Sequence, residues 1–331
     1  MKMKPMKNLI TGGAGFIGSH LAERLLENGE KVTVIDNLST GSIKNIEHLK
    51  RDPKFSYHID TIMNRNTMRR LIKESDMVYH LAAAVGVQYI IDNPLESIKT
   101  NVEGTEIVLE LAHSLGNKKV VVASTSEIYG KDRPGKRIFK EDDDRVLGAT
   151  TISRWSYSCT KALDEFLAFA YWREKHLPVV IARFFNTCGS RQTGRYGMVV
   201  PRFIKQALSG KPITIYGDGK QSRCFTDVRD TVRALVLLSK NRSAVGEVFN
   251  IGNPYNKVTI NALAGRIKHM CASGSMIVRI PYEKAFSGGF EDMRHREPDI
   301  KKLRSLTGFN PKIKMDEMLY TMIDDIGKGQ R

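Results

Sequence analysis

Tyr157 and Lys161 are the residues of this sequence whose types and spacing most directly indicate chemistry. They stand four positions apart, so on a helix both side chains leave the same face, one turn apart. A phenol beside an ammonium ionises more readily, because the positive charge favours the phenolate. We therefore expect Lys161 to lower the pKa of Tyr157, and Tyr157 to act as a base. The same spacing also fits an ordinary pair on the surface of a helix.

A second group of polar residues, 124–127 (Ser-Thr-Ser-Glu), stands at the end of a hydrophobic run that predicts a strand over 119–124. In open parallel sheets, ligands bind beyond the carboxyl ends of the strands. The helix predicted over 153–176 comes next along the chain, so Tyr157 could face this group across one cleft. The two serine hydroxyls could equally cap the turn after the strand.

The elements that must position these residues begin with a glycine-rich turn. The order is strand, glycine turn, helix, strand and acid, over 8–11, 12–18, 19–28, 31–35 and Asp36. Gly12 permits the tight turn, Gly15 lets the backbone approach a pyrophosphate, and Gly18 lets helix and strand pack closely. The phosphates then lie at the helix N-terminus. Asp36 would accept hydrogen bonds from the ribose hydroxyls and repel a 2′-phosphate, so we predict NAD rather than NADP as the cofactor.

Strands and helices continue to alternate up to about residue 186. They are predicted as strands over 55–59, 76–81, 119–124 and 178–183 and as helices over 64–74, 94–115 and 153–176. This alternation predicts an α/β fold with a Rossmann-like, doubly wound parallel sheet. Beyond Asn186 the elements shorten, which indicates a smaller C-terminal α/β lobe that binds the substrate. We expect an NAD-binding domain over 1–186 plus about 225–250, and the substrate-binding lobe over about 187–224 and 251–331.

Composition and charge narrow the class of protein. The chain is 41% hydrophobic and 27% charged, as in ordinary globular proteins, and it has no apolar run of membrane-spanning length. The basic start lacks the apolar region of a signal peptide, so we expect a cytoplasmic protein. The four cysteines are far apart and match no zinc pattern, so we predict no metal site. The net charge of +16 is scattered along the chain and suits an anionic small molecule as well as nucleic acid.

The sequence resembles the extended short-chain dehydrogenase/reductase family, and within it the enzymes that modify nucleotide-activated sugars. The segments that carry the resemblance span nearly the whole chain: 11–18, 36–41, 80–83, 100–105, 124–130, 157–161, 183–187 and 216–223. The resemblance implies an NAD that is held tightly and recycled. It also implies a nucleotide-sugar substrate, with a UDP-sugar as the best match, and a homodimer formed through paired helices. We predict neither a nucleic-acid nor a membrane partner.

The resemblance further implies a role for each residue at a family motif. Tyr157 removes the proton of the sugar 4-hydroxyl while hydride passes from C4 to NAD, and Lys161 binds the nicotinamide ribose. Thr125, with its serine neighbours, hydrogen-bonds the reacting oxygen. The other implied catalytic residues are Ser126 and Glu127. The implied cofactor-binding residues are Gly12, Gly15, Phe16, Ile17, Gly18, Asp36, Asn37, Ser39, Thr40, Gly41, Asp60, Thr61, Leu81, Ala82, Ala83, Asn101, Ser124, Tyr157, Lys161 and Phe184. The implied substrate-binding residues are Asn186, Val200, Tyr216, Arg223 and Arg296.

Three reactions can follow oxidation at C4. The ketone can be reduced on its other face, can acidify C5–H so that the 6-hydroxyl leaves as water, or can release carbon dioxide from a C6 carboxylate. Glu127 stands where the family's epimerases usually have a small residue, and 125–127 resembles both dehydratases and UDP-glucuronate decarboxylases. Segments 154–161 and 295–300 also resemble decarboxylases, whereas 84–91 is more similar to epimerases.

The best-matched specific activity is therefore that of a UDP-glucuronate decarboxylase, which makes UDP-xylose. A UDP-hexose or UDP-hexuronate 4-epimerase and a nucleotide-hexose 4,6-dehydratase stay open as alternatives. A hypothesis of another class is a basic regulator that binds NAD or nucleic acid and has lost catalysis. The presence of Tyr157, Lys161 and Thr125 together argues against such a regulator, which need not keep them.

Overall fold

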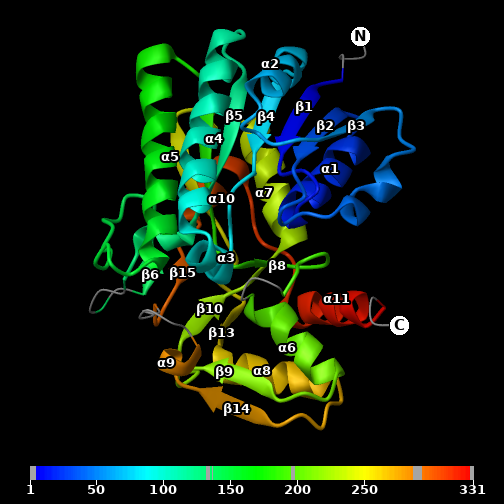
Figure 1. Ribbon diagram of the computed structural model, residues 1–331, viewed down its shortest axis with the longest axis vertical. Helices are drawn as coiled ribbons and strands as arrows, with labels where there is room; N and C mark the ends of the chain where they lie inside the picture. Colours follow the sequence, from blue (N-terminus) through cyan, green and yellow to red (C-terminus); the bar gives the residue numbers. More distant parts are fainter. Residues whose placement is uncertain (1–4, 132–134, 136, 195–197, 286–292, 329–331) are drawn as a thin grey trace.

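The structure, a computed structural model, describes residues 5–131, 135, 137–194, 198–285 and 293–328. Within these residues, the centre of the molecule is a seven-stranded sheet in the order β12-β7-β5-β4-β1-β2-β3 (Figure 1). Every pair of neighbouring strands in it is parallel. The strands are β1 (Lys7–Thr11), β2 (Lys31–Asp36), β3 (Phe55–Ile59), β4 (Met77–His80), β5 (Lys119–Thr125), β7 (Val179–Phe184) and β12 (Glu247–Ile251). The direction of winding reverses between β1 and β4, which is the point where ligands bind in such sheets.

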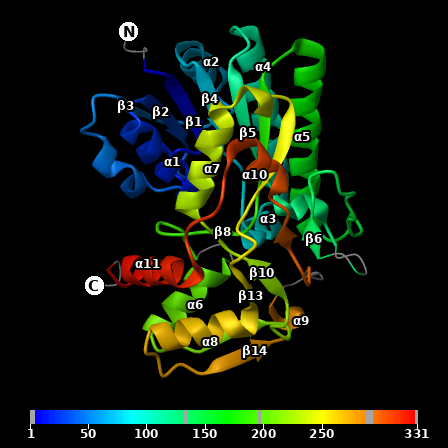
Figure 2. The ribbon, with the colours of Figure 1, turned by 180° about the vertical axis from the view of Figure 1, so that it is seen from behind.

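Helices cover both faces of this sheet, as Figures 1 and 2 show from opposite sides. One face carries α1 (Phe16–Glu27), α7 (Val228–Lys240) and α10 (Lys301–Thr307), and the other α2 (Arg65–Glu74), α4 (Pro94–Ser114) and α5 (Arg154–Lys175). Successive strand residues point to opposite faces. Leu9 and Ile10 of β1 are accordingly both fully buried, but in different cores. The sheet is thus a rigid support whose carboxyl edge stays open between the helices.

A smaller group of elements lies below the sheet in Figure 1. It comprises α6 (Val199–Leu208), β9 (Ile213–Tyr216), β10 (Ser222–Cys224), β13 (Lys257–Thr259), α8 (Ile260–Met270), β14 (Ile277–Ile280), α9 (Tyr282–Ala285) and α11 (Met315–Lys328). Helices α6, α8 and α11 share a core of their own, in which Phe203, Leu263 and Leu319 are fully buried. Strand β9 pairs with β14, and β10 pairs with β13.

The chain passes repeatedly between the sheet and this smaller group. After β7 it enters the smaller group, and it then returns through α7 to add β12 to the edge of the sheet beside β7. The late strand β15 (Glu297–Pro298) pairs with β6 (Ile138–Phe139), and β11 (Thr226–Asp227) pairs with β8 (Thr187–Cys188). The remaining short elements are α3 (Val87–Asp92) and the 3-10 turns η1 (Ile43–Asn45), η2 (Glu47–Leu49), η3 (Ser126–Tyr129) and η4 (Arg242–Ala244). These crossings bring segments distant in sequence to the carboxyl edge of the sheet.

The predicted parallel α/β sheet is present, and each predicted strand ends within one residue of its expected bounds. The first helix begins at Phe16 rather than Ser19, because the end of the glycine turn is already helical. Helix α3 and the short strand β6 were not predicted. Among the described residues, no helix is long and apolar enough to cross a membrane.

Candidate active site

The glycine turn between β1 and α1 forms the floor of the site because backbone segments approach each other closely there. A Cβ added to Gly18 would lie 2.2 Å from the carbonyl oxygen of Gly12, and one on Gly15 would lie 3.0 Å from the same atom. Gly12 has a φ of +70°, and a Cβ there would meet the backbone of Ala82 at 2.9 Å. The first N–H groups of α1 lack a side-chain cap at Gly15. Such a turn fits a pyrophosphate, as NAD requires.

Asp36 ends β2 and joins the glycine turn to the loop that follows the strand. Its Oδ2 accepts a hydrogen bond from the backbone N–H of Ala14 at 3.0 Å, and its Oδ1 accepts one from that of Leu38 at 2.8 Å. Burial raises the pKa of this carboxyl group, and the backbone N–H groups oppose the rise. Asp36 therefore lies at the position where the sequence predicts contact with the adenosine ribose, and backbone N–H groups orient it.

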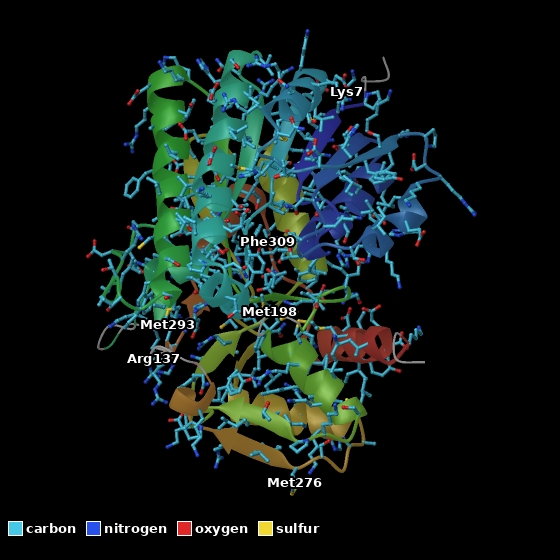
Figure 3. All side chains as sticks on the ribbon, viewed as in Figure 1. Lys7, Arg137, Met198, Met276, Met293 and Phe309 are labelled. Carbon is cyan, nitrogen blue, oxygen red and sulfur yellow. The ribbon has the colours of Figure 1, made fainter. Side chains whose placement is uncertain are left out.

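A cleft of about 400 Å³ opens along the carboxyl edge of the sheet. Most of the predicted cofactor-binding and catalytic residues line it: Gly12, Gly15, Phe16, Ile17, Gly18, Asp36, Asn37, Ser39, Thr40, Asp60, Thr61, Leu81, Ala82, Ala83, Ser124, Thr125, Ser126, Glu127, Tyr157, Lys161 and Phe184. Two of the predicted substrate-binding residues, Asn186 and Arg296, line it as well. The lining also includes residues that the sequence did not single out, among them Tyr89, Gln192, Thr193 and Met198. In Figure 3 Met198 lies where the sheet meets the smaller group of elements.

Some predicted residues lie outside this cleft. Among the described residues, the lining does not include Gly41, Asn101, Val200, Tyr216 or Arg223. Val200 is fully buried in the core of α6, α8 and α11. The Tyr216 ring is covered by the guanidinium of Arg202, whose Cζ is 4.0 Å from the ring centroid. Arg223 is buried in β10 and donates to the carbonyl oxygen of Ser222.

Asn101 holds the loop after β4 in place. Its Oδ1 accepts a hydrogen bond from the backbone N–H of Ala84 at 2.7 Å, and its Nδ2 donates to the Ala84 carbonyl oxygen at 3.3 Å. This bidentate contact fixes a segment that lines the cleft, although Asn101 itself does not. The role of Asn101 in this structure is therefore to shape the wall, since its side-chain amide is occupied by protein backbone.

A buried histidine holds the same loop from the other side. His80 Nδ1 lies 2.9 Å from the hydroxyl of Thr11, and its Nε2 lies 3.0 Å from that of Thr105. Burial lowers the pKa of His80 to about 3, so the ring is neutral. The Thr11 hydroxyl also accepts from the N–H of Ala82 at 3.2 Å. The network fixes the backbone of the loop after β4, which includes Ala82, and His80 does not need to exchange protons.

Tyr157 and Lys161 are on the first turns of α5, in the cleft wall, as predicted. Lys161 Nζ donates to Asp164 Oδ2 at 2.7 Å, and both side chains are buried. Burial raises the pKa of Tyr157, the carboxylates of Glu127 and Asp164 raise it further, and a hydrogen bond with the Thr125 hydroxyl opposes the rise. The predicted lowering of this pKa is therefore wrong for the protein side chains by themselves. Loss of hydration and two carboxylates outweigh the ammonium, which is already paired.

The hydroxyl groups at the end of β5 have different partners. Ser124 donates to Glu165 Oε1 at 2.5 Å, in a buried contact. The Thr125 hydroxyl contacts Tyr157 and also accepts from the backbone N–H of Glu127 at 3.1 Å. Ser158 of α5 donates to the Glu127 carbonyl oxygen at 2.8 Å, which fixes η3 against the helix. Thr125 is thus the hydroxyl group of this segment that is placed to assist Tyr157.

Glu127 lies between two buried arginines. Its Oε1 is 3.1 Å from Arg296 Nη1 and 3.8 Å from Arg154 Nη2. The two arginine side chains are only 6% and 4% exposed, whereas that of Glu127 is 19% exposed. Guanidinium groups form paired hydrogen bonds with carboxylates and phosphates. The sequence reasoning missed Arg154 as a site residue. The signal that could have found it is its place three residues before Tyr157, on the adjacent turn of the same helix.

Comparison with known protein families and curated proteins gives extensive similarity. Residues 9–322 match the family described as GDP-mannose 4,6 dehydratase. The chain is 44% identical over 317 residues to the UDP-N-acetyl-alpha-D-glucosaminuronate decarboxylase of Bacillus cytotoxicus, covering 95% of this chain and 96% of that protein. It is 37% identical over 316 residues to UDP-glucuronic acid decarboxylase 1 of Danio rerio, covering 95% of this chain and 71% of that protein.

Solved structures with the same fold bind NAD. The UDP-glucuronic acid 4-epimerase of Bacillus cereus, in complex with UDP-glucuronic acid and NAD, superposes with a TM-score of 0.88 at 30% identity, over 98% of this chain and 99% of that one. The dTDP-glucose 4,6-dehydratase of Bacillus anthracis, in complex with NAD, superposes with a TM-score of 0.85 at 26% identity, over 98% of this chain and 97% of that one. These findings confirm the predicted fold, the predicted NAD cofactor and the prediction of a nucleotide-sugar enzyme related to decarboxylases, epimerases and dehydratases.

Proposed function

The chain belongs to the GDP-mannose 4,6-dehydratase family, and within it we propose that this enzyme decarboxylates a UDP-linked hexuronate through a 4-keto intermediate. UDP-N-acetylglucosaminuronate is the first candidate substrate, because the relative at 44% identity acts on it, and UDP-glucuronate is the second. The observation that carries the proposal is the pair of buried arginines, Arg154 and Arg296, at the Glu127 carboxylate beside Tyr157.

The proposed reaction begins at the C4 hydroxyl of the sugar. Tyr157, in contact with Thr125, takes the proton of this hydroxyl as C4 becomes a ketone. Bound NAD, held along the glycine turn and Asp36, would supply the acceptor for the hydride from C4 and the hydride for the final reduction. The C6 carboxylate is then β to a ketone, so the C5–C6 bond can break with its electrons moving to the C4 oxygen. Carbon dioxide leaves, C5 takes up a proton, and the ketone is reduced.

Arg296, which lines the cleft, suits the extra carboxylate of such a substrate. Arg154 lies on the other side of Glu127 and is not part of the cleft lining in this structure, and we propose that it adds to the positive charge at this carboxylate. A planar guanidinium group can donate two parallel hydrogen bonds to a carboxylate. Burial lowers the local dielectric constant and so strengthens the attraction between the two charges. Glu127 already shows that a carboxylate is accommodated between them. A 4-epimerase of a neutral hexose needs no group that binds a C6 carboxylate, so these arginines favour a hexuronate substrate. The similarity to decarboxylases then favours decarboxylation over 4-epimerisation of that hexuronate. In the same proposal Lys161 binds the nicotinamide ribose, and Asn186, which lines the cleft, binds the nucleotide half of the substrate.

We further propose a homodimer formed through α4 and α5, in a cytoplasmic protein. The two helices pack side by side on one face of the sheet (Figure 1). Their outer surfaces expose large apolar side chains: Leu95 at 67%, Ile98 at 42%, Leu163 at 44% and Phe166 at 65%. An apolar surface formed by two helices suits a second copy of the same helices, because both would lose water-exposed area. We also propose the functional division into an NAD-binding part, residues 1–186 plus about 225–250, and a substrate-binding lobe over the rest.

Incubation of the purified enzyme with UDP-N-acetylglucosaminuronate and with UDP-glucuronate, followed by mass spectrometry, tests the proposal. We expect loss of the mass of carbon dioxide from at least one of them, and no turnover by a Tyr157→Phe control. An isomer of unchanged mass would contradict decarboxylation and favour a 4-epimerase. Loss of water from a UDP- or dTDP-hexose would favour a 4,6-dehydratase.

A further inference from the structure

We propose that Asp164 is a positioning residue that orients Lys161 and, by partly neutralising it, sets the pH at which Tyr157 becomes a base. The inference rests on the roles proposed above for Tyr157 and Lys161. Asp164 was not among the residues implied by the sequence. The role of Asp164 deepens the proposed function, because it concerns how this chain controls the first step of the reaction.

The contact between Asp164 and Lys161 is short and buried. Lys161 Nζ donates to Asp164 Oδ2 at 2.7 Å. The side chain of Asp164 is 0% exposed, and that of Lys161 is 3% exposed. The residues are three positions apart on α5, so the helix itself fixes their separation. Lys161 therefore enters the cleft wall already held by a carboxylate, with its remaining N–H groups available for the nicotinamide ribose.

Packing alone does not explain an acid at this position. Asp164 is fully buried on the inner face of α5, where an amphipathic helix normally carries an apolar residue. Besides Lys161, Asp164 has a polar contact with the hydroxyl of Thr105 on α4. A fully buried carboxylate is costly unless it is paired. Burial accordingly raises the pKa of Asp164, and the Lys161 ammonium opposes the rise. The pair to Lys161 is the compensating interaction for this charge.

The other charged groups around Tyr157 and Lys161 have partners of their own. On η3, Glu127 lies beside Arg296 and Arg154. On β4, His80 faces Lys161 but is neutral, as its pKa of about 3 requires.

The next residue of α5, Glu165, is also a buried carboxylate but has a different partner. It pairs with Arg183 of β7 through hydrogen bonds of 2.9 and 2.7 Å. Thr105 of α4 is the polar neighbour of Asp164 from the adjacent helix. Among the described residues, Asp164 is thus the carboxylate that forms an ion pair with Lys161.

The consequence for Tyr157 follows from the signs of the charges. The Lys161 ammonium favours the phenolate, and the Asp164 carboxylate disfavours it. With both present, their fields largely cancel at the phenol, so the base forms only at higher pH. Removing the Asp164 charge while keeping its shape leaves the ammonium uncompensated. The pKa of Tyr157 then falls, and the enzyme becomes active at lower pH.

The test compares Asp164→Asn with Glu165→Gln, an adjacent buried carboxylate that does not bind Lys161. For each variant we would measure kcat/KM against pH on whichever nucleotide sugar the enzyme turns over, together with bound NAD and the melting temperature. We expect the acid limb of the Asp164→Asn profile to move down by about one pH unit. Glu165→Gln should lower the melting temperature and leave the limb in place.

The outcomes separate this inference from the proposed function. If Tyr157→Phe and Lys161→Met are inactive but the Asp164→Asn limb does not move, only the role of Asp164 is wrong. If Tyr157→Phe or Lys161→Met remains active, the proposed catalytic roles are wrong. A purely structural Asp164 would change the melting temperature without moving the limb. Should Asp164→Asn not fold, Asp164→Ser removes the same charge with a smaller side chain and carries the same expectation.

Discussion

Carboxylates and basic groups at the cleft are paired residue by residue rather than scattered. Glu127 lies between Arg296 and Arg154, and Asp164 is bonded to Lys161. Each pairing affects a different stage of the proposed reaction: the arginines concern the C6 carboxylate, and Asp164 concerns the proton taken by Tyr157. The sequence identified Tyr157, Lys161 and Glu127 because motifs fix their spacing along the chain. It implied Arg296 but not its contact with Glu127, and it did not single out Arg154 or Asp164, because pairing depends on which side chains meet in the folded interior.

Thr125 and Ser124 give the first prediction. The Thr125 hydroxyl contacts Tyr157, whereas Ser124 donates to Glu165. We expect Thr125→Val to lower kcat on the order of 10²-fold, because a donor at the reacting oxygen is lost. Ser124→Ala should lower stability by about 1–3 kcal/mol and retain most of kcat, because the buried carboxylate of Glu165 loses one hydrogen bond and keeps those from Arg183. Steady-state kinetics and urea denaturation measure the two effects. The assignment is wrong if Ser124→Ala loses as much turnover as Thr125→Val at unchanged stability.

Arg154 and Arg296 give the second prediction. Lysine keeps the charge but loses the planar fork, so we expect Arg154→Lys and Arg296→Lys each to raise the KM for the hexuronate at least ~10-fold. Arg294→Lys is the matched control, since Arg294 is 60% exposed and pairs with Asp218. The product lacks the C6 carboxylate, so isothermal titration should show that its affinity falls much less in these variants than the affinity for the substrate. Equal losses for substrate and product would place the arginines on the diphosphate instead.

At the scale of elements, the hydrophobic strands and the glycine turn were predictable because each is a local pattern. A buried parallel strand must be apolar on both faces, and the turn needs glycine where a Cβ would collide with backbone. Helix α3 and strand β6 were not predictable in this way, because both are short and β6 pairs with the distant strand β15. Arg296 reaches Glu127 because it precedes β15, which pairs with β6. No pattern along the chain indicates that pairing.

Two glycines in helices give the third prediction. A Cβ on Gly18 of α1 would lie 2.2 Å from the Gly12 carbonyl oxygen, whereas one on Gly265 of α8 would meet nothing within 4 Å. We expect Gly18→Ala to abolish retention of NAD, because helix and turn must separate. Gly265→Ala should keep NAD and raise stability by up to about 1 kcal/mol. The absorbance of cofactor released on denaturation measures the NAD content, and the melting temperature measures the stability. Normal NAD content in Gly18→Ala would contradict the close packing of this turn.

At the scale of the whole molecule, the cleft is built from both groups of elements. The sheet edge supplies most of the residues predicted to bind the cofactor, and the late chain supplies Arg296. The overall sheet followed from the sequence because alternating strands and helices leave few arrangements. The position of the smaller group relative to the cleft did not follow from the sequence, because it depends on repeated crossings of the chain between the two groups of elements.

The apolar surface of α4 and α5 gives the fourth prediction. Phe166 is 65% exposed in the middle of α5, and we expect Phe166→Glu to convert the proposed dimer to monomers. Tyr320→Glu is the control, because Tyr320 is 71% exposed on α11, away from these helices. Sedimentation velocity over a range of protein concentrations measures the masses. A wild-type monomer at all concentrations would remove the basis for this interface.

The late addition of β12 to the sheet has a consequence for synthesis on the ribosome. Strand β7 is complete at Phe184, but its outer neighbour β12 is formed by Glu247–Ile251, after α6, β9 and β10 of the smaller group. A nascent chain therefore holds its glycine turn, Asp36 and the Tyr157 helix while one edge of its sheet is still bare. An unpaired edge strand can pair with another chain. Emergence of β12 from the exit tunnel pairs β7, and β12 then becomes the edge strand of the sheet. Arg296 follows β12 along the chain, so the part proposed to bind the cofactor is synthesised before the cleft is complete.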